Sequence, residues 1–169
     1  MKTAIYGPSG AGKTTMATML WEGGDTMFLD LDKEIRQLDA VQDDRLFTFR
    51  EHLGLELFGN KNAFFNQQSS TQKTINYNTW SHHILYNPSI RTRFEDMLFY
   101  DVFLPKIKNI ESVIVDGLLP RFVKMYPFDQ VIYVTAPEHI RRRNLSSRGV
   151  IPSRINEIIS LQSKMDWSI

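Results

Sequence analysis

A glycine-rich turn near the start of the chain constrains the fold more than any other feature of the sequence. Residues 7–14, GPSGAGKT, fit the spacing G-x-x-x-x-G-K-[ST]. The turn follows the short apolar run 3–6 and precedes residues 13–21, whose composition favours a helix. Glycines at these positions let successive backbone N–H groups face one anion, and the helix adds the positive end of its dipole. The pattern therefore predicts a strand, a polyphosphate-binding loop and a helix, in that order.

Three further short aliphatic runs predict a sheet. They lie at 27–31, 112–115 and 130–134. The expected helices between and after the strands cover residues 33–38, 88–107, 138–146 and 153–164. Alternation of strands and helices is typical of a parallel sheet covered by helices, so we expect the α/β class. A length of 169 residues suits one domain, 1–169.

Composition and charge exclude several classes of protein for this chain. With 42% hydrophobic and 23% charged residues, the chain should form a globular domain. A net charge of +1 does not indicate a dedicated nucleic-acid-binding protein, although a local basic patch stays open. The absence of cysteine excludes disulfide scaffolds, thiolate zinc sites and cysteine nucleophiles. No apolar run in the sequence suits a membrane span or a signal peptide, so we expect a cytoplasmic protein without a membrane partner.

The predicted loop carries residues suited to ATP and Mg²⁺. Lys13 can reach the β- and γ-phosphate oxygens and follow the moving charge, which makes it a candidate catalytic residue. The Thr14 hydroxyl can join the Mg²⁺ shell. The loop residues expected to bind nucleotide are Gly7, Ser9, Gly10, Ala11, Gly12, Lys13, Thr14 and Thr15. An ordinary glycine turn beside a helix-start lysine is the alternative.

Carboxylates are expected at the carboxyl ends of two strands. Strand alternation would point Asp30 and Asp32 to the same side. Asp32 is the candidate general base and a substrate-binding residue, and it could equally cap the following helix. Asp116 follows the third aliphatic run. It is a candidate ligand for Mg²⁺ and a candidate substrate contact, with a surface turn as the alternative.

Basic residues gather near the carboxyl end of the chain. They are Arg141, Arg142, Arg143, Arg148 and Arg154. We expect a lid at 138–153 that closes over ATP, with Arg148 as a catalytic residue and Arg143 as a nucleotide contact. A solvated helix face is the alternative.

A polar stretch at 59–78 shows neither helical nor strand periodicity. We expect a mobile surface loop there, or a cover on the acceptor side that orders when substrate binds. Phe64 and Phe65 would anchor it.

From Thr3 to about Gln162 the chain resembles dephospho-coenzyme A kinases. The resemblance is carried by GPSGAGKTT, FLDLDKEIRQL, ILYNPSIRTRFEDML, VIVDGLL and VIYVTAPEHIRRRNLSSRG with RINEIISLQ. It implies a three-layer P-loop kinase sandwich, with a helical acceptor region inserted at 59–105 and a lid. By the same resemblance, roles in catalysis, substrate binding, the lid and the last helix fall on Asp32, Arg36, Arg143, Arg148 and Gln162. Phe99 and Tyr100 stand where that family has His-Pro.

The expected function is ATP-dependent phosphotransfer to a small nucleotide-like acceptor. The chain lacks the Asn-Lys-x-Asp motif of GTPases and the Leu-Ser-Gly-Gly-Gln motif of transport ATPases. Dephospho-coenzyme A is the first acceptor that the resemblance suggests. A nucleoside or deoxynucleoside monophosphate kinase, and a kinase acting on a hydroxyl of modified nucleic acid such as hydroxymethylated DNA, stay open. So does a catalytically inactive nucleotide-binding module. The first forty residues also suit shikimate-type kinases.

Overall fold

The structure is a computed structural model that describes residues 1–21, 24–67 and 73–169. The chain forms two compact units, the first made of residues 1–32 and 106–169 and the second of residues 33–105. Each unit has its own sheet. Among the described residues, no helix has the length and apolar character needed to cross a bilayer.

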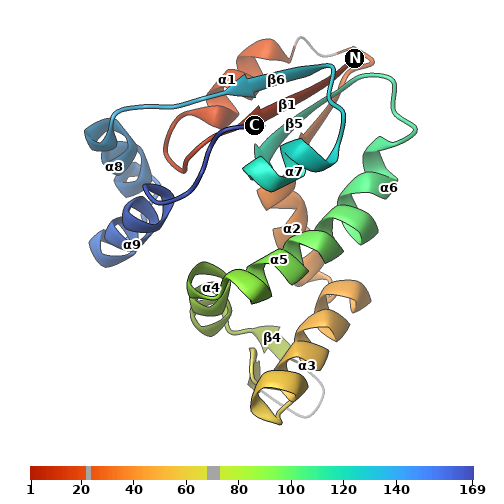
Figure 1. Ribbon diagram of the computed structural model, residues 1–169, viewed down its shortest axis with the longest axis vertical. Coiled ribbons are helices and arrows are strands. Elements are labelled where there is room, and N and C mark those ends of the chain that lie inside the picture. The colour runs from red at the N-terminus through yellow and green to blue at the C-terminus, as the bar shows by residue number, and fades with distance from the viewer. Residues whose placement is uncertain (22–23, 68–72) are drawn as a thin grey trace. The chain divides into compact units, whose positions relative to one another are not determined.

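The first unit is built on a parallel sheet (Figure 1). Its strands are β1 (Lys2–Tyr6), β2 (Met27–Asp30), β5 (Val113–Leu118) and β6 (Gln130–Tyr133). They lie in the order β2-β5-β1-β6, and every neighbouring pair is parallel. Parallel neighbours require crossover connections, which helices supply. The expected α/β class and its strands are confirmed, with bounds that differ by at most three residues at each end.

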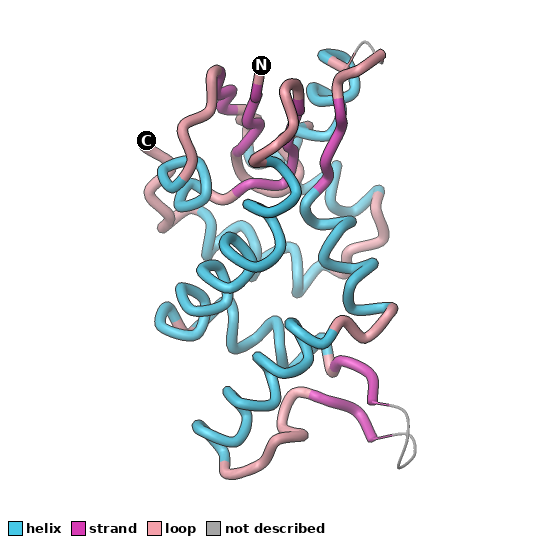
Figure 2. The backbone as a smooth tube through the Cα atoms, turned by 90° about the vertical axis from the view of Figure 1, so that its right-hand side faces the viewer, coloured by secondary structure: helices cyan, strands magenta, loops and turns pink. Residues whose placement is uncertain are grey.

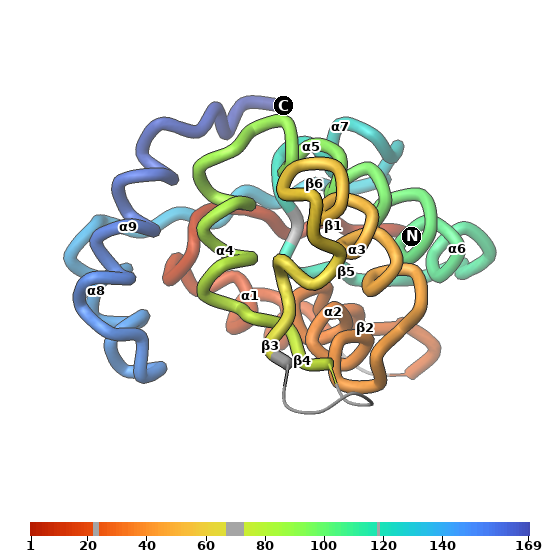
Figure 3. Tube along the Cα trace, turned by 90° about the horizontal axis from the view of Figure 1, so that it is seen from below, coloured from red at the N-terminus to blue at the C-terminus, as the bar shows by residue number. Residues whose placement is uncertain are grey.

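Helices cover both faces of this sheet. The helices that lie wholly in the first unit are α1 (Lys13–Leu20), α7 (Pro120–Met125), α8 (Glu138–Ser147) and α9 (Pro152–Gln162). Figures 1 and 3 show α1 and α7 on opposite sides of the sheet. Ala17 of α1 packs in a buried cluster with Ile5 and Ile114 of the sheet. Because β1 and α1 are both held in this core, the loop that joins them starts and ends at fixed points.

The hairpin of α8 and α9 has a small core of its own. α8 and α9 lie side by side (Figure 1). Leu145 of α8 and Ile155 and Ile159 of α9 form one buried cluster. After α9 the chain returns to the sheet, where the Tyr6 hydroxyl donates a hydrogen bond to the carbonyl oxygen of Trp167 at 3.1 Å. The two carboxyl-terminal helices are thereby tied to the end of β1.

The second unit is mainly helical. It contains most of α2 (Leu31–Ala40), then α3 (Asp44–Phe58), β3 (Phe65–Gln67), β4 (Lys73–Ile75), α4 (Tyr77–Tyr86), α5 (Pro88–Met97), the π-helix η1 (Leu98–Phe103) and the start of α6 (Leu104–Ile107). The helix expected at 88–107 is confirmed as the continuous run of α5, η1 and α6. The sequence reading did not anticipate α3, α4 or α7.

The expectation of an irregular loop at 59–78 holds for residues 59–64 and was wrong for the short strands β3 and β4 and for the start of α4. β3 and β4 pair in an antiparallel ladder (Figure 2), and α4 begins at Tyr77. Each strand has only three residues, which is too short for alternation to be visible in the sequence. Phe64 and Phe65 are buried, as expected of anchors. Residues 68–72 of this stretch lie outside the described residues.

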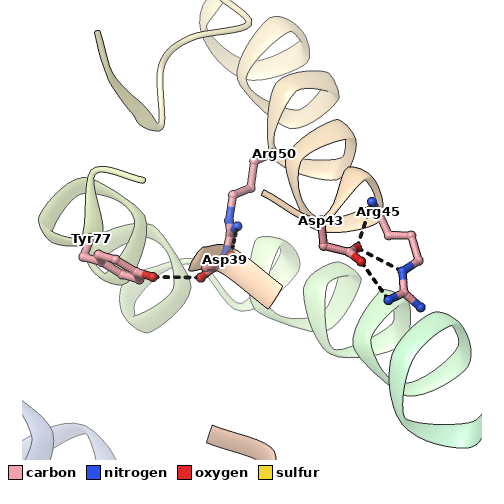
Figure 4. Close-up of polar contacts among 5 residues, drawn as sticks. All are labelled: Asp39, Asp43, Arg45, Arg50 and Tyr77. Atoms are coloured by element: carbon pink, nitrogen blue, oxygen red, sulfur yellow. Dashed lines mark hydrogen bonds and ion pairs between the residues drawn. The ribbon is translucent and has the colours of Figure 1, made fainter. Parts of the chain in front are cut away.

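The second unit contains a buried ion pair between Arg50 and Asp39. Figure 4 shows the pair together with Tyr77. The Arg50 guanidinium donates to both carboxylate oxygens of Asp39, at 2.5 and 3.2 Å. The Tyr77 hydroxyl donates to the same carboxylate at 3.0 Å. Arg50 also lies over the ring of Trp80, 4.8 Å from its centroid. Burial, followed by the charge of Asp39, raises the pKa of Tyr77, so the hydroxyl stays a donor.

Candidate phosphate-binding site

Two glycines of the loop between β1 and α1 combine a positive φ with close approach of other backbone atoms. Gly7 and Gly10 have φ angles of 142° and 79°. A β-carbon on Gly7 would collide with the carbonyl oxygen of Val134, and one on Gly10 would lie 2.6 Å from the carbonyl oxygen of Arg141. Other parts of the backbone therefore pack directly against the loop, and this close approach explains the two glycines.

Lys13 lies at the start of α1, with its ammonium group turned back over the loop. Its Nζ donates to the carbonyl oxygen of Pro8 at 3.1 Å. Burial lowers the pKa of Lys13, and nearby carboxylates partly oppose this effect. The charges that act on Lys13 come from Asp116, Asp32, Arg148 and Arg141. The carboxylates of Asp116 and Asp32 raise the pKa of Lys13, whereas the charges of Arg148 and Arg141 lower it.

Thr14 and Asp116 are joined directly. The Thr14 hydroxyl donates to the Asp116 carboxylate at 2.6 Å. Asp116 is 2% exposed and lies inside β5, so the surface-turn reading of this residue is excluded. Its other carboxylate oxygen accepts the backbone N–H of Gly117 at 2.7 Å. The pair offers a hydroxyl and a carboxylate side by side at the start of α1.

Asp30 and Asp32 are not placed as strand alternation predicted. Asp30 ends β2, where it pairs in register with Asp116, and α2 begins at the next residue, Leu31. Asp32 therefore lies in the first turn of a helix instead of continuing the strand, and it is not the residue before the helix. An acidic residue in a first turn still suits the helix dipole.

The Asp32 carboxylate lies beside the strand that carries Asp116. Gly117 has a φ of 86°, and a β-carbon built on it would lie 3.5 Å from Cγ of Asp32. The Asp32 side chain is exposed, in contrast to the buried Asp116. One carboxylate at this edge is thus engaged by Thr14, while a second reaches solvent next to it.

The α8–α9 hairpin touches the loop through residues that sequence reasoning mostly missed. Arg141 donates from Nε to the Ser9 carbonyl oxygen at 2.9 Å, and Asn144 donates from Nδ2 to the Gly10 carbonyl oxygen at 2.8 Å. Gln162, which only the resemblance had suggested, contacts Ser9. Arg143, the predicted nucleotide contact, is exposed, and the hydrogen bonds to the loop come from its neighbours.

Helical spacing was the signal that could have found these contacts. Arg141, Asn144, Leu145 and Arg148 are separated by three, one and three positions, which places them on one face of a helix. Leu145 on this face is buried, so the face is turned inward. Arg143 lies outside this set.

The other predicted site residues lie in the loop and on the helices α1, α2 and α8. Ala11 is buried in the loop, Gly12 precedes α1, and Thr15 is exposed in the first turn of α1. Arg36 is exposed on α2, in the second compact unit. The predicted lid, 138–153, covers α8 and the turn that leads into α9.

The donor atoms at Thr14 and Asp116 fit Mg²⁺. Both are hard oxygen donors, and Mg²⁺ is usually held by one or two protein oxygens together with water and substrate phosphates. Across residues 1–21, 24–67 and 73–169 there is no cluster of three or more His, Cys, Asp or Glu that could hold a metal by itself. A cation here would need ligands from a bound phosphate and from water.

Comparison with known proteins identifies the family. The chain aligns with 98% coverage to "Crystal structure of TT1252 from Thermus thermophilus", with 80% of that chain covered, a TM-score of 0.62 and 17% identity, which shows a shared fold. No curated protein matches the sequence. A family model described as "AAA domain" matches residues 1–97, more than half of the 169 residues. This chain therefore belongs to the AAA domain family and has the nucleotide-binding P-loop of that family.

Proposed function

We propose that this chain is an ATP-dependent kinase that transfers the γ-phosphoryl group to a small, nucleotide-like acceptor. The observation that carries the proposal is the arrangement of two carboxylates whose charges both act on Lys13. Asp116 is engaged by Thr14, whereas the exposed Asp32 lies next to Gly117. A second carboxylate that is exposed beside a phosphate loop suits the deprotonation of an acceptor hydroxyl.

The chemistry assigns one task to each group. The acceptor oxygen gives its proton to the Asp32 carboxylate as it forms the new bond to the γ-phosphorus. The bond from that phosphorus to the β,γ-bridging oxygen breaks, and ADP keeps the electron pair. Lys13 exchanges the Pro8 carbonyl oxygen for phosphate oxygens, and Arg148 balances the charge of the departing group. In this account Lys13, Asp32 and Arg148 are catalytic.

Thr14 and Asp116 would hold Mg²⁺, and Asp116 would also lie beside the substrate. When bound, the ion neutralises charge on the β- and γ-phosphate oxygens. The backbone and side chains of Gly7, Ser9, Gly10, Ala11, Gly12 and Thr15 would surround the phosphates. Arg143 is retained as a nucleotide contact that requires movement of the lid, since it is exposed.

The acceptor side is assigned by resemblance to dephospho-coenzyme A kinases. Arg36 would bind the acceptor, residues 59–105 would form the acceptor region of a single domain, and 138–153 would act as the lid. A nucleoside or deoxynucleoside monophosphate is the second candidate acceptor, and a hydroxyl of modified DNA the third. A cytoplasmic location, and partners limited to ATP and the acceptor, are parts of the same proposal.

A panel of transfer assays tests the proposal. The purified chain is incubated with γ-labelled ATP, Mg²⁺ and one acceptor at a time, and labelled product is separated from phosphate. The acceptors are dephospho-coenzyme A, nucleoside monophosphates, shikimate and hydroxymethylated DNA. Lys13→Ala is the control and should lose transfer by on the order of 10²-fold. Label found only in phosphate would indicate an ATPase, and nucleotide binding without turnover would indicate an inactive module.

A further inference from the structure

Three side chains of the α8–α9 hairpin hold the loop from outside. They are Arg141, Asn144 and Gln162, and their hydrogen bonds to the loop fall on Ser9 and Gly10. We propose that these side chains form a clamp that positions the backbone of the loop for phosphate, so that nucleotide affinity is set from the carboxyl-terminal helices. The inference rests on the proposed function only for the identity of the ligand.

Gln162 holds Ser9 at two atoms. Its Oε1 accepts the Ser9 backbone N–H at 2.9 Å, and its Nε2 donates to the Ser9 hydroxyl at 2.9 Å. The same Oε1 accepts Nη2 of Arg141 at 2.7 Å. The amide group of Gln162 thus holds both the backbone and the side chain of Ser9. It also orients Arg141, which binds the Ser9 carbonyl oxygen in the next peptide unit.

These hydrogen bonds fix the orientation of the peptide units in the loop, because the two polar groups of a peptide unit have fixed relative directions. In a trans peptide unit the C=O and N–H bonds point in opposite directions. Arg141 holds the Ser9 carbonyl toward α8, so the N–H of Gly10 in the same unit points away from α8. Gln162 holds the Ser9 N–H, so the Pro8 carbonyl of that unit points the other way, where it meets Lys13. The clamp therefore sets the direction of two successive peptide units.

Gln162 is itself fixed to the strand that begins the loop. The indole N–H of Trp167 donates to the Gln162 carbonyl oxygen at 3.0 Å. Trp167 in turn accepts from Tyr6, the last residue of β1. The path from Tyr6 through Trp167 and Gln162 to Ser9 closes a ring of hydrogen bonds around the base of the loop. A ring of this kind resists displacement of the clamp by thermal motion.

Arg141 contributes a positive charge to the clamp as well as hydrogen bonds. It is 9% exposed, and its partners, the Ser9 carbonyl and the Gln162 amide oxygen, are both uncharged. Burial lowers the pKa of Arg141. A bound phosphate would compensate this buried positive charge, which gives the clamp a reason to favour the occupied loop.

The first test separates the effect of the Arg141 hydrogen bonds on nucleotide affinity from the effect of its positive charge. Arg141→Lys keeps the charge but cannot reproduce the two-pronged contact of the guanidinium. MgATP affinity, measured by calorimetry, should fall about tenfold, the equivalent of one net hydrogen bond of about 1.4 kcal/mol. Arg142→Lys is the matched control, because Arg142 pairs with Glu138 and Asn156 instead of the loop. Equal affinity in the Arg141 variant and the control would overturn the proposal.

The second test needs no nucleotide. Gln162→Ala should speed amide hydrogen exchange in residues 7–12 of the ligand-free protein, and Ser163→Ala in the same helix region should not. Asn144→Ala gives the same readout if Gln162→Ala does not fold. Unchanged exchange in both variants would refute the clamp. If the parent protein bound no nucleotide, the proposed function would fail, and loop exchange alone would decide whether the clamp exists.

Discussion

The buried pair of Arg50 and Asp39 allows a quantitative prediction about the second unit. Asp39→Asn preserves the shape of the side chain and removes its charge. The side chains of Arg50 and Asp39 are 1% and 3% exposed, and Trp80 and Phe94 cover the guanidinium. The substitution therefore leaves an uncompensated cation that water cannot reach.

The expected cost follows from this burial. Removing one partner of a buried ion pair typically lowers the free energy of unfolding by about 3–5 kcal/mol. Two features place Asp39→Asn in that range. Both guanidinium-to-carboxylate contacts are lost or weakened. Nε of Arg50 already has no hydrogen-bond partner among the described residues, so none of them offers the arginine a second acceptor. Replacing both residues, as Asp39→Leu with Arg50→Met, should restore most of the loss.

Urea unfolding followed by hydrogen exchange in peptides from residues 33–105 measures the effect in this unit. Glu56→Gln is the control, since it breaks the exposed pair of Glu56 and Arg93 and should leave the unfolding midpoint unchanged. A loss below about 1 kcal/mol for Asp39→Asn, in the range of surface pairs, would refute the reasoning.

Three further outcomes are expected. Gly7→Ala should abolish nucleotide binding, measured by calorimetry, and lower the melting temperature, because its β-carbon would collide with the Val134 carbonyl oxygen. Burial lowers the pKa of His83, so the unfolded chain takes up protons first as pH falls. The free energy of unfolding that the neutral ring contributes is fully present above about pH 6.5 and is lost as the pH falls below it. His83→Phe should therefore reduce the pH dependence of the free energy of unfolding, measured by urea titrations at several pH values. Arg148→Ala should slow phosphoryl transfer more than it weakens ATP binding, and equal effects in kinetic and binding assays would argue against a role at the moving phosphoryl group.

Local sequence signals were sufficient to predict the strands of the first unit and the loop after β1, although not α7. The strands are short aliphatic runs, and the loop spacing fixes both the glycines and Lys13, so these elements could be recognised without knowledge of their neighbours. Thr14 and Asp116 were separate candidates for binding Mg²⁺, and the structure joins them by a hydrogen bond at the carboxyl ends of parallel strands. Here the fold class determines which residues meet.

Features that depend on long-range packing were not predictable. β3 and β4 are stabilised by their pairing and by buried Phe64 and Phe65, and their polar sequence shows no alternation. The contact of Arg141 with the loop was missed because the inward face of α8 is defined by what packs against it. The position of Asp32 depended on where β2 ends and α2 begins, which is a boundary that no single residue marks.

The most direct test of the central claim is the fate of the γ-phosphoryl group in the Asp32→Asn variant. Transfer to the acceptor is measured beside ATP affinity for the parent chain, Asp32→Asn and Asp30→Asn. The account predicts that Asp32→Asn lowers transfer by on the order of 10²-fold or more with little change in ATP affinity, because an amide cannot accept the acceptor's proton. Parent-level transfer by Asp32→Asn, together with a loss in Asp30→Asn, would contradict the assignment of the catalytic carboxylate.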